Sequence, residues 1–174
     1  MNYTRLDDII SFTLGNNSTR IKDTHQIIYT QDDFEMDLHG KNTVNPGCGC
    51  IVNLMRSKAA PLSEENKGKS ITANYLLCEF DDMLLDPWYF CYLFNESPDV
   101  QKQITKFSQG TVLSVKRLNV QMIANMEVKL PDISRQSMLG NLYRQTVIQY
   151  DLMLEQAENM KTMTMALMRK IEED

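Results

Sequence analysis

The feature that most constrains the fold of this 174-residue chain is its C-terminal stretch, which has no proline after Pro131 and a single glycine, Gly140. Two rows of residues recur in it every seven positions, three or four residues apart. This heptad pattern is typical of a helix that buries a narrow stripe against another helix. The predicted seam consists of Leu139, Tyr143, Thr146, Tyr150, Met153, Ala157, Met160, Thr164, Leu167 and Ile171.

The predicted helix is too long for the core of one small domain. Residues 134–172 would form a rod of roughly 58 Å at ~1.5 Å per residue. Much of its stripe must therefore meet another helix, unless the helix packs back on its own domain. Two threonines in the seam, Thr146 and Thr164, and six of the twelve methionines at or after position 138 indicate an adaptable interface.

The residues before the helix predict an α+β domain with a small mixed β-sheet and short helices. Alternating or β-branched runs predict strands over 25–30, 50–55, 71–80, 110–115 and 126–130. Capping residues predict helix starts at Thr30, at Asp86 with Pro87, at Ser97 with Pro98, and at Ser134. We therefore expect a globular domain over 1–133 and one long coiled-coil helix over 134–174.

Composition is that of a globular protein, with 43% hydrophobic and 24% charged residues. No apolar run approaches the roughly 18 residues of a membrane span, and the first ten residues do not resemble a signal peptide. We therefore expect a cytoplasmic protein without a membrane role. The net charge is −5, but the basic residues are concentrated in 41–69 and 100–135. Such basic segments either bind an anionic partner or are simply solvent-exposed surface.

Four cysteines and one histidine raise the question of a metal site. Cys48, Cys50, Cys78 and His39 could together supply four zinc ligands. The alternative, which we favour, is that the cysteines are free thiols buried in the core. We therefore expect no metal and no cofactor.

One catalytic pattern can be extracted from the sequence. Asp99, Glu127 and Lys129 have the spacing of a metal-dependent nuclease. However, Asp99 follows Pro98 and is better explained as an early residue of a helix, whereas the nuclease needs it on a strand. His25 and His39 lie outside any nucleophile motif, and no phosphate-binding or dinucleotide-binding loop is present. We therefore expect a protein that is not an enzyme.

An ordered set of motifs in the second half of the chain resembles a known family. The set comprises "LDPWYF", "SPDVQKQI", Gly110 with Thr111, the run from Arg117 to Asn119, and "L-P-x-x-x-x-Q" at Leu130, Pro131 and Gln136, followed by the long helix. Together these segments resemble the end of a target recognition domain from the DNA-specificity (S) subunit of type I restriction-modification systems. "TRLDDIISFTLG" is similar to the start of such a domain. A full-length subunit has two recognition domains and two helices, so this chain resembles a half-subunit.

The resemblance implies a function and a set of partners. It implies sequence-specific recognition of double-stranded DNA, with docking of methyltransferase (M) subunits and possibly restriction (R) subunits. The second helix would come from another chain, most simply in a homodimer that reads an interrupted target. The alternative is a coiled-coil interaction protein without a DNA role. The candidate DNA contacts are Arg20, Lys22, Lys41, Arg56, Lys58, Lys67, Lys69, Lys116 and Arg117.

Overall fold

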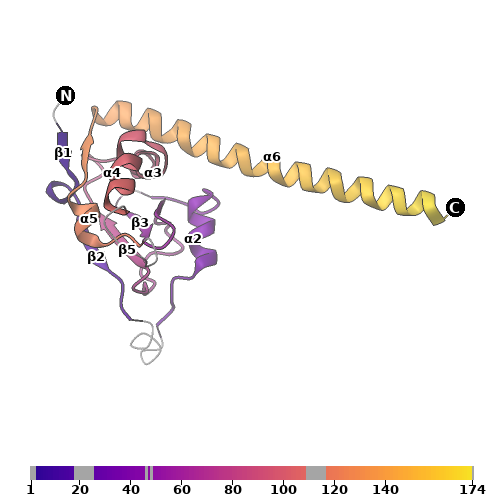
Figure 1. The fold of residues 1–174 in the computed structure, drawn as a ribbon, viewed down its shortest axis with the longest axis horizontal. Coiled ribbons are helices and arrows are strands. Elements are labelled where there is room, and N and C mark those ends of the chain that lie inside the picture. Colours follow the sequence, from indigo (N-terminus) through magenta and orange to yellow (C-terminus); the bar gives the residue numbers. More distant parts are fainter. Residues whose placement is uncertain (1–2, 18–25, 46, 48, 109–116, 174) are drawn as a thin grey trace.

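The computed structural model describes residues 3–17, 26–45, 47, 49–108 and 117–173, and the elements below lie within these ranges. In chain order they are β1 (Tyr3–Arg5), η1 (Leu6–Asp8), β2 (Ser11–Leu14), α2 (Gln31–Leu38), β3 (Cys50–Asn53), β4 (Lys58–Pro61), β5 (Tyr75–Glu79), α3 (Pro87–Glu96), α4 (Pro98–Ser108), α5 (Val120–Ala124), β6 (Glu127–Lys129) and α6 (Ile133–Glu173). The α+β fold class with a long C-terminal helix is thus confirmed. Figure 1 shows α6 running along one side of the domain and projecting far beyond it.

The strands form two small sheets. One has the order β2-β5-β3-β4, and the other pairs β1 with β6. All ladders between these strands are antiparallel. The expectation of a mixed sheet was wrong in this respect, since within the described residues parallel pairing is limited to isolated bridges at Asn16–Thr72 and Ile28–Ser70. Residues 26–30 form the second of these bridges instead of the predicted strand, and residues 110–115 lie outside the described part of the chain.

The main core lies between the four-stranded sheet and α3. Phe90 and Phe94 of α3 are each 1% exposed, and they pack with Val52 and Leu76 of the sheet. Burying a side chain of this size contributes about 1.5–3 kcal/mol. A smaller second cluster gathers Tyr29 and Phe34 on the other side, where α2 covers β4. The sheet is therefore covered by helices on both faces, and α3 makes the most extensive contact with α6.

Two of the predicted helix starts are confirmed in detail. The Thr30 side chain accepts from Asp33 N, and the Asp33 carboxylate accepts from Thr30 N, which completes a capping box. The Asp86 side chain accepts from Tyr89 N, and Pro87 takes the first helical position of α3. At α6 the prediction was off by two residues, because Asp132 and not Ser134 caps it: its carboxylate accepts from Arg135 N at 3.0 Å.

The joint between the domain and α6 is formed by Asp86, Gln136 and Gly140. The Gln136 side chain is 2% exposed; it donates to the Leu84 and Pro131 carbonyls and accepts from Asp86 N. A Cβ on Gly140 would lie 2.4 Å from Asp86 Oδ1 and 2.8 Å from Tyr89 N. The absence of a side chain at Gly140 therefore lets α6 approach the start of α3 closely.

Beyond Asp151, α6 leaves the domain. Residues 152–173 are all exposed. Among the described residues, no helix is both long enough and apolar enough to cross a membrane. The free end of α6 is therefore a helical arm that its own domain does not cover.

Candidate partner and nucleic-acid interfaces

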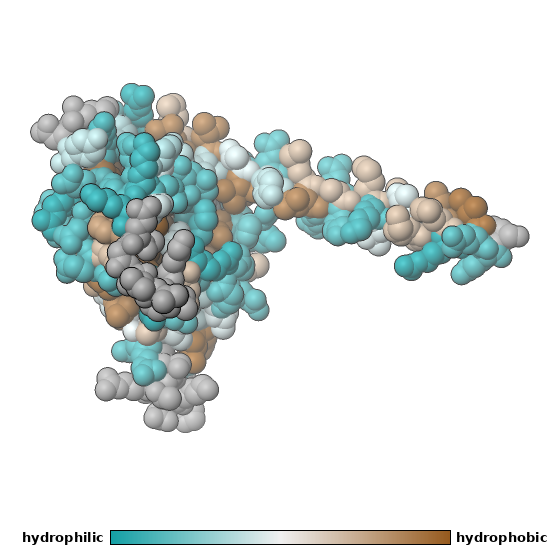
Figure 2. Space-filling view, in the orientation of Figure 1, coloured by the Kyte–Doolittle hydropathy of each residue, from teal (hydrophilic) through white to brown (hydrophobic). Residues whose placement is uncertain are grey.

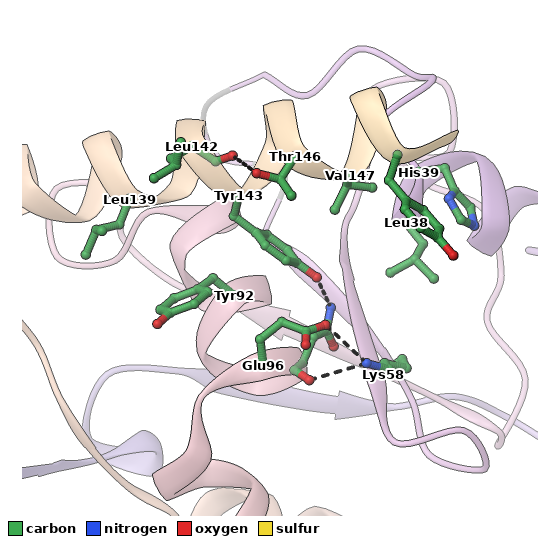
Figure 3. A pocket seen from close by; sticks show the side chains of 12 residues that line it. Leu38, His39, Lys58, Tyr92, Glu96, Leu139, Leu142, Tyr143, Thr146 and Val147 are labelled. Atoms are coloured by element: carbon green, nitrogen blue, oxygen red, sulfur yellow. Dashed lines mark hydrogen bonds and ion pairs between the residues drawn. The ribbon is translucent and has the colours of Figure 1, made fainter. Parts of the chain in front are cut away.

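A hollow of about 690 Å³ opens between α6 and the domain, and we call it the α6 groove (Figure 3). Its volume lies within the range typical of ligand-binding pockets, roughly 300–1,000 Å³. One wall belongs to α6: Leu139, Leu142, Tyr143, Thr146, Val147 and Tyr150. The other wall belongs to α2, α3 and β4: Leu38, His39, Lys58, Tyr92, Asn95 and Glu96.

Tyr143 and Asn95 form the floor of the groove. Asn95 Nδ2 donates to the Tyr143 hydroxyl at 3.1 Å, and the same buried amide holds the backbone of Ala59 through two hydrogen bonds of 2.8 Å. Burial raises the pKa of Tyr143 to about 12, so its hydroxyl stays protonated at neutral pH. Lys58 and Glu96 form an ion pair at the rim, with Nζ 3.4 Å from Oε1. The groove is thus preformed, with an apolar interior and a charged rim.

The predicted seam residues divide into two groups along α6. Leu139 and Tyr143 are partly buried and pack against the core. The other eight are exposed; among them Tyr150 is 61%, Met160 60% and Ile171 67% exposed. Figure 2 shows apolar side chains along the arm as far as its tip. The alternative of a helix packed wholly on its own domain is therefore wrong beyond Asp151.

Trp88 supports α6 from below. Its Cβ is 3.1 Å from the Cβ position of Gly140, and its ring tip is 3.3 Å from that of Gly40, which has a φ of +66° at the end of α2. The Tyr143 ring stands edge-on to it at 6.4 Å, and the Arg144 guanidinium lies over it at 5.9 Å. His39 Nδ1 lies 2.8 Å from Asp151 Oδ2, which adds an ion pair when the imidazole is protonated. The angle of α6 is therefore fixed by contacts over about five turns.

Four of the predicted DNA contacts are paired with carboxylates of the same chain. Within the described residues, the pairs are Arg56–Glu35, Lys58–Glu96, Lys67–Glu64 and Lys69–Asp33. Burial alone would raise the pKa of Asp33, but hydrogen bonds from Thr30 and Lys69 lower it. Burial also opposes ionisation of Glu35, while hydrogen bonds from Gln31 and Arg56 lower its pKa. These carboxylates are thus ionised at neutral pH and partly neutralise the cations.

The remaining basic candidates lie elsewhere. Arg117 donates to the Ala73 carbonyl, which holds it beside the loop before β5. Lys41 lines a second hollow together with His39 and Asp151. Arg20, Lys22 and Lys116 lie outside the described residues. Among the described candidates, Arg56 and Lys69 both lie beside α2 through Glu35 and Asp33, whereas Lys58 borders the α6 groove.

Two of the residues considered for metal binding, Cys50 and Cys78, lie in the core of the domain. Cys50 and Cys78 are neighbours across β3 and β5, and both are buried, as is Cys91, whose Sγ is 3.8 Å from that of Cys50. Burial raises the pKa of the Cys50 and Cys78 thiols, so they stay protonated. Cys48 and His25 lie outside the described residues. Across the described ranges, no three His, Cys, Asp or Glu residues are grouped to hold a metal ion.

The nuclease alternative is also without support in the geometry. Asp99 lies in the first turn of helix α4, while Glu127 and Lys129 are exposed on β6. The Gln103 side chain occupies the gap, since it bonds both the N–H and the carbonyl of Glu127. This arrangement agrees with the explanation of Asp99 as an early helical residue.

Sequence reasoning missed several residues of the groove. Asn95 is a buried polar residue that directly follows the largely apolar residues 87–94 of α3, and that contrast was the available signal. Leu38 and Tyr92 carried no signal, because they line the groove only through the way α2 and α3 meet α6.

A solved structure of an HsdS subunit from Thermoanaerobacter tengcongensis matches 90% of this chain, with a TM-score of 0.56 and 16% sequence identity. The chain therefore has the fold of a type I specificity subunit, which confirms the resemblance. It spans 39% of the length of that subunit. No family model and no curated protein matches the sequence.

Proposed function

We propose that this chain acts as a half-length specificity subunit of a type I restriction-modification system. In this role residues 1–133 bind double-stranded DNA, residues 134–174 pair with another helix, and the catalytic steps belong to the methyltransferase and restriction subunits. The observation that carries the proposal is the rigid attachment of a partly bare helix to a domain with the specificity-subunit fold.

The uncovered arm supports pairing with a second helix. An apolar stripe of this extent on a helix surface marks an interface. A second copy of the chain is the simplest source, because a two-fold homodimer buries both stripes at once. Two identical domains would then read the two halves of an interrupted palindrome, with the helices fixing the distance between the halves.

The charge distribution determines how DNA would bind. Lys41 and Arg117, together with Arg20, Lys22 and Lys116, would contact phosphates directly. Arg56, Lys58, Lys67 and Lys69 would first have to exchange a carboxylate of the same chain for a phosphate. Binding by the isolated chain would consequently be weak, and the methyltransferase subunits would complete the DNA-binding surface.

The test is co-expression of this chain with a type I methyltransferase subunit encoded beside it, followed by mapping of methylated bases. We expect one interrupted palindromic motif, modified only when this chain is present. A matched control is a chain truncated after Asp151, which keeps the domain and its contacts with α6 but lacks the arm. Modification of the same motif without the chain would exclude the proposed role, and full activity of the truncated chain would exclude the pairing role of the arm.

A second candidate function is an interaction protein that pairs through α6 and does not bind DNA. The observation that favours it is the neutralisation of four predicted DNA contacts by carboxylates, in a chain with a net charge of −5. This protein would form dimers in light scattering. It would show no salt-dependent binding to duplex DNA, even with the methyltransferase present.

A further inference from the structure

A chain of charged side chains joins Arg56 to α6 across the end of α2. Glu35 Oε1 takes the Arg56 guanidinium and also accepts from Gln31 Nε2 at 2.7 Å. Glu35 Oε2 lies 3.4 Å from Nε2 of His39, one helical turn later. His39 Nδ1 in turn lies 2.8 Å from Asp151 Oδ2 on α6. We call these four residues, Arg56, Glu35, His39 and Asp151, the ion-pair chain.

His39 lies where a positive charge is favoured. It is the C-cap residue of α2, as Figure 3 shows, and the last carbonyls of a helix carry partial negative charge. Glu35 and Asp151 flank its two ring nitrogens. A neutral imidazole has one ring N–H and can donate to only one of these carboxylates, whereas the imidazolium can donate to both. The contact with α6 therefore depends on how strongly Glu35 attracts the imidazolium.

The contact between His39 and Asp151 is close but incomplete. His39 Nδ1 is buried and has no hydrogen-bond partner within the described residues, although Asp151 Oδ2 lies within hydrogen-bond distance. The direction of the ring N–H, and not the distance, is thus what prevents a hydrogen bond. A small rotation of the imidazole would turn this ion pair into a charge-assisted hydrogen bond, which is roughly twice as strong as a neutral one.

Glu35 is shared between two cations. The Arg56 guanidinium and a protonated His39 approach the same carboxylate and repel each other. A DNA phosphate that takes the guanidinium leaves Glu35 to the imidazolium alone, so the imidazolium and its contact with Asp151 become more stable. Because coupled equilibria are reciprocal, a firm contact with Asp151 also makes the release of Arg56 easier.

We propose that His39 is a positioning residue that couples DNA binding by Arg56 to the attachment of α6 through Asp151. This inference rests on the proposed DNA-binding function and adds a link between the DNA contacts and the helix. The four side chains are between 19% and 45% exposed, so solvent weakens each pair and the coupling should be a few-fold. The protein would therefore hold its target most tightly when α6 is firmly attached.

Asp151→Asn tests the coupling from the α6 end of the ion-pair chain. The full-length chain, in complex with its methyltransferase, is titrated by fluorescence anisotropy with a duplex that carries the mapped methylation motif. We expect Asp151→Asn to weaken binding about threefold, although the loss of a negative charge should by itself strengthen binding to DNA. Glu155→Gln is the matched control, since Glu155 lines the same hollow as Asp151 without an ion pair among the described residues. It should leave the affinity unchanged or slightly higher.

The Glu35→Gln background separates coupling from a purely structural role of Asp151. Without the shared carboxylate, Asp151→Asn should no longer change the affinity for the duplex. A threefold loss that persists in this background would show that Asp151 only supports α6, and would overturn the inference. An Asp151→Asn protein that binds as tightly as the parent, or more tightly, would also overturn it.

Hydrogen exchange of the chain without DNA gives a result that does not depend on the proposed function. Arg56→Ala imitates the departure of the guanidinium, so backbone amides of residues 148–155 should exchange about threefold more slowly. In a His39→Gln background the same change should have no effect. Slower exchange in a protein whose complex binds no duplex would reject the DNA-binding function but leave the ion-pair chain in place. Unchanged exchange would reject the coupling and leave DNA recognition untouched.

Discussion

The Gln136 side-chain oxygen accepts a hydrogen bond from the backbone N–H of Asp86 at 3.1 Å, and this contact joins α6 to the start of α3 across fifty positions of sequence. The Gln136 amide group donates to two carbonyls at 2.9 and 3.0 Å, so both the nitrogen and the oxygen of the buried side chain have hydrogen-bond partners. Both residues belong to the motifs on which the family resemblance rests. The two motifs that contain Asp86 and Gln136 therefore meet in a structural joint.

Replacing Gln136 by Ala should weaken this joint. The change leaves one N–H and two carbonyls without partners in a buried site, and each such group costs about 1–3 kcal/mol. We expect a loss of at least about 2 kcal/mol in the free energy of unfolding, measured by urea denaturation. Gln145→Ala, on the exposed face of the same helix, is the control and should change stability by less than about 0.5 kcal/mol. Equal effects of the two changes would contradict the role of the joint.

Gly140→Ala should destabilise the protein although alanine is the better helix former. Propensity alone favours alanine by about 1 kcal/mol, but the new methyl group would lie 2.4 Å from Asp86 Oδ1. We expect a net loss of about 1–3 kcal/mol, typical of overpacking, in the same denaturation experiment. Asn141→Ala, one residue later and exposed, should be neutral or slightly stabilising. A stabilised Gly140→Ala protein would show that α6 can move away from α3 without loss.

Two leucines of nearly equal exposure can be used to test whether the heptad rows of α6 form a specific interface. Leu167 is 58% and Leu152 is 59% exposed, but only Leu167 belongs to the heptad rows. Leu167→Glu should weaken dimerisation by at least about tenfold, or 1.4 kcal/mol, since it places a charge in the interface. Leu152→Glu should leave the dimer unchanged in analytical ultracentrifugation. Similar behaviour of the two variants would exclude the seam.

Because Glu35 is paired with Arg56, removing the charge of Glu35 should strengthen DNA binding. Glu35→Gln frees the guanidinium, so a complex with the methyltransferase should bind duplex DNA several-fold more tightly, with a steeper dependence of log K on log salt. Arg56→Ala should have the opposite effect and reduce the slope by about one unit. Fluorescence anisotropy at several salt concentrations measures both. An unchanged slope in both variants would remove Arg56 from the set of DNA contacts.

The features that could be predicted from the sequence are those encoded within one or two turns. Thr30 with Asp33, and Asp86 with Pro87, determine their helix starts locally. The long helix also follows from its own periodicity. Strand β4 was missed because Lys-Ala-Ala-Pro has no strand pattern, and its strand structure depends on pairing with β3.

The candidate site was predictable only in part, for the same reason. The heptad rows identify which residues of α6 are available for pairing, but the opposite wall of the groove depends on how α2 and α3 pack. The basic residues were visible in the sequence, whereas three of the four carboxylates paired with them come from distant positions, as Asp33 does for Lys69. Whether a lysine is free therefore depends on tertiary structure.

Trp88 lies in the core, and because α6 packs on it, it helps to determine where the far end of α6 lies. Some twenty residues of helix, about 33 Å, extend beyond Asp151, which pairs with His39, so a tilt of about 5° at the joint would move the tip by about 3 Å, more than half a helical turn. In a two-fold pair such a tilt would change the separation of the two domains and hence the number of base pairs between half-sites. A substitution at Trp88 could thus alter the spacing of the DNA target without any contact with DNA, while changes in the loops alter its sequence.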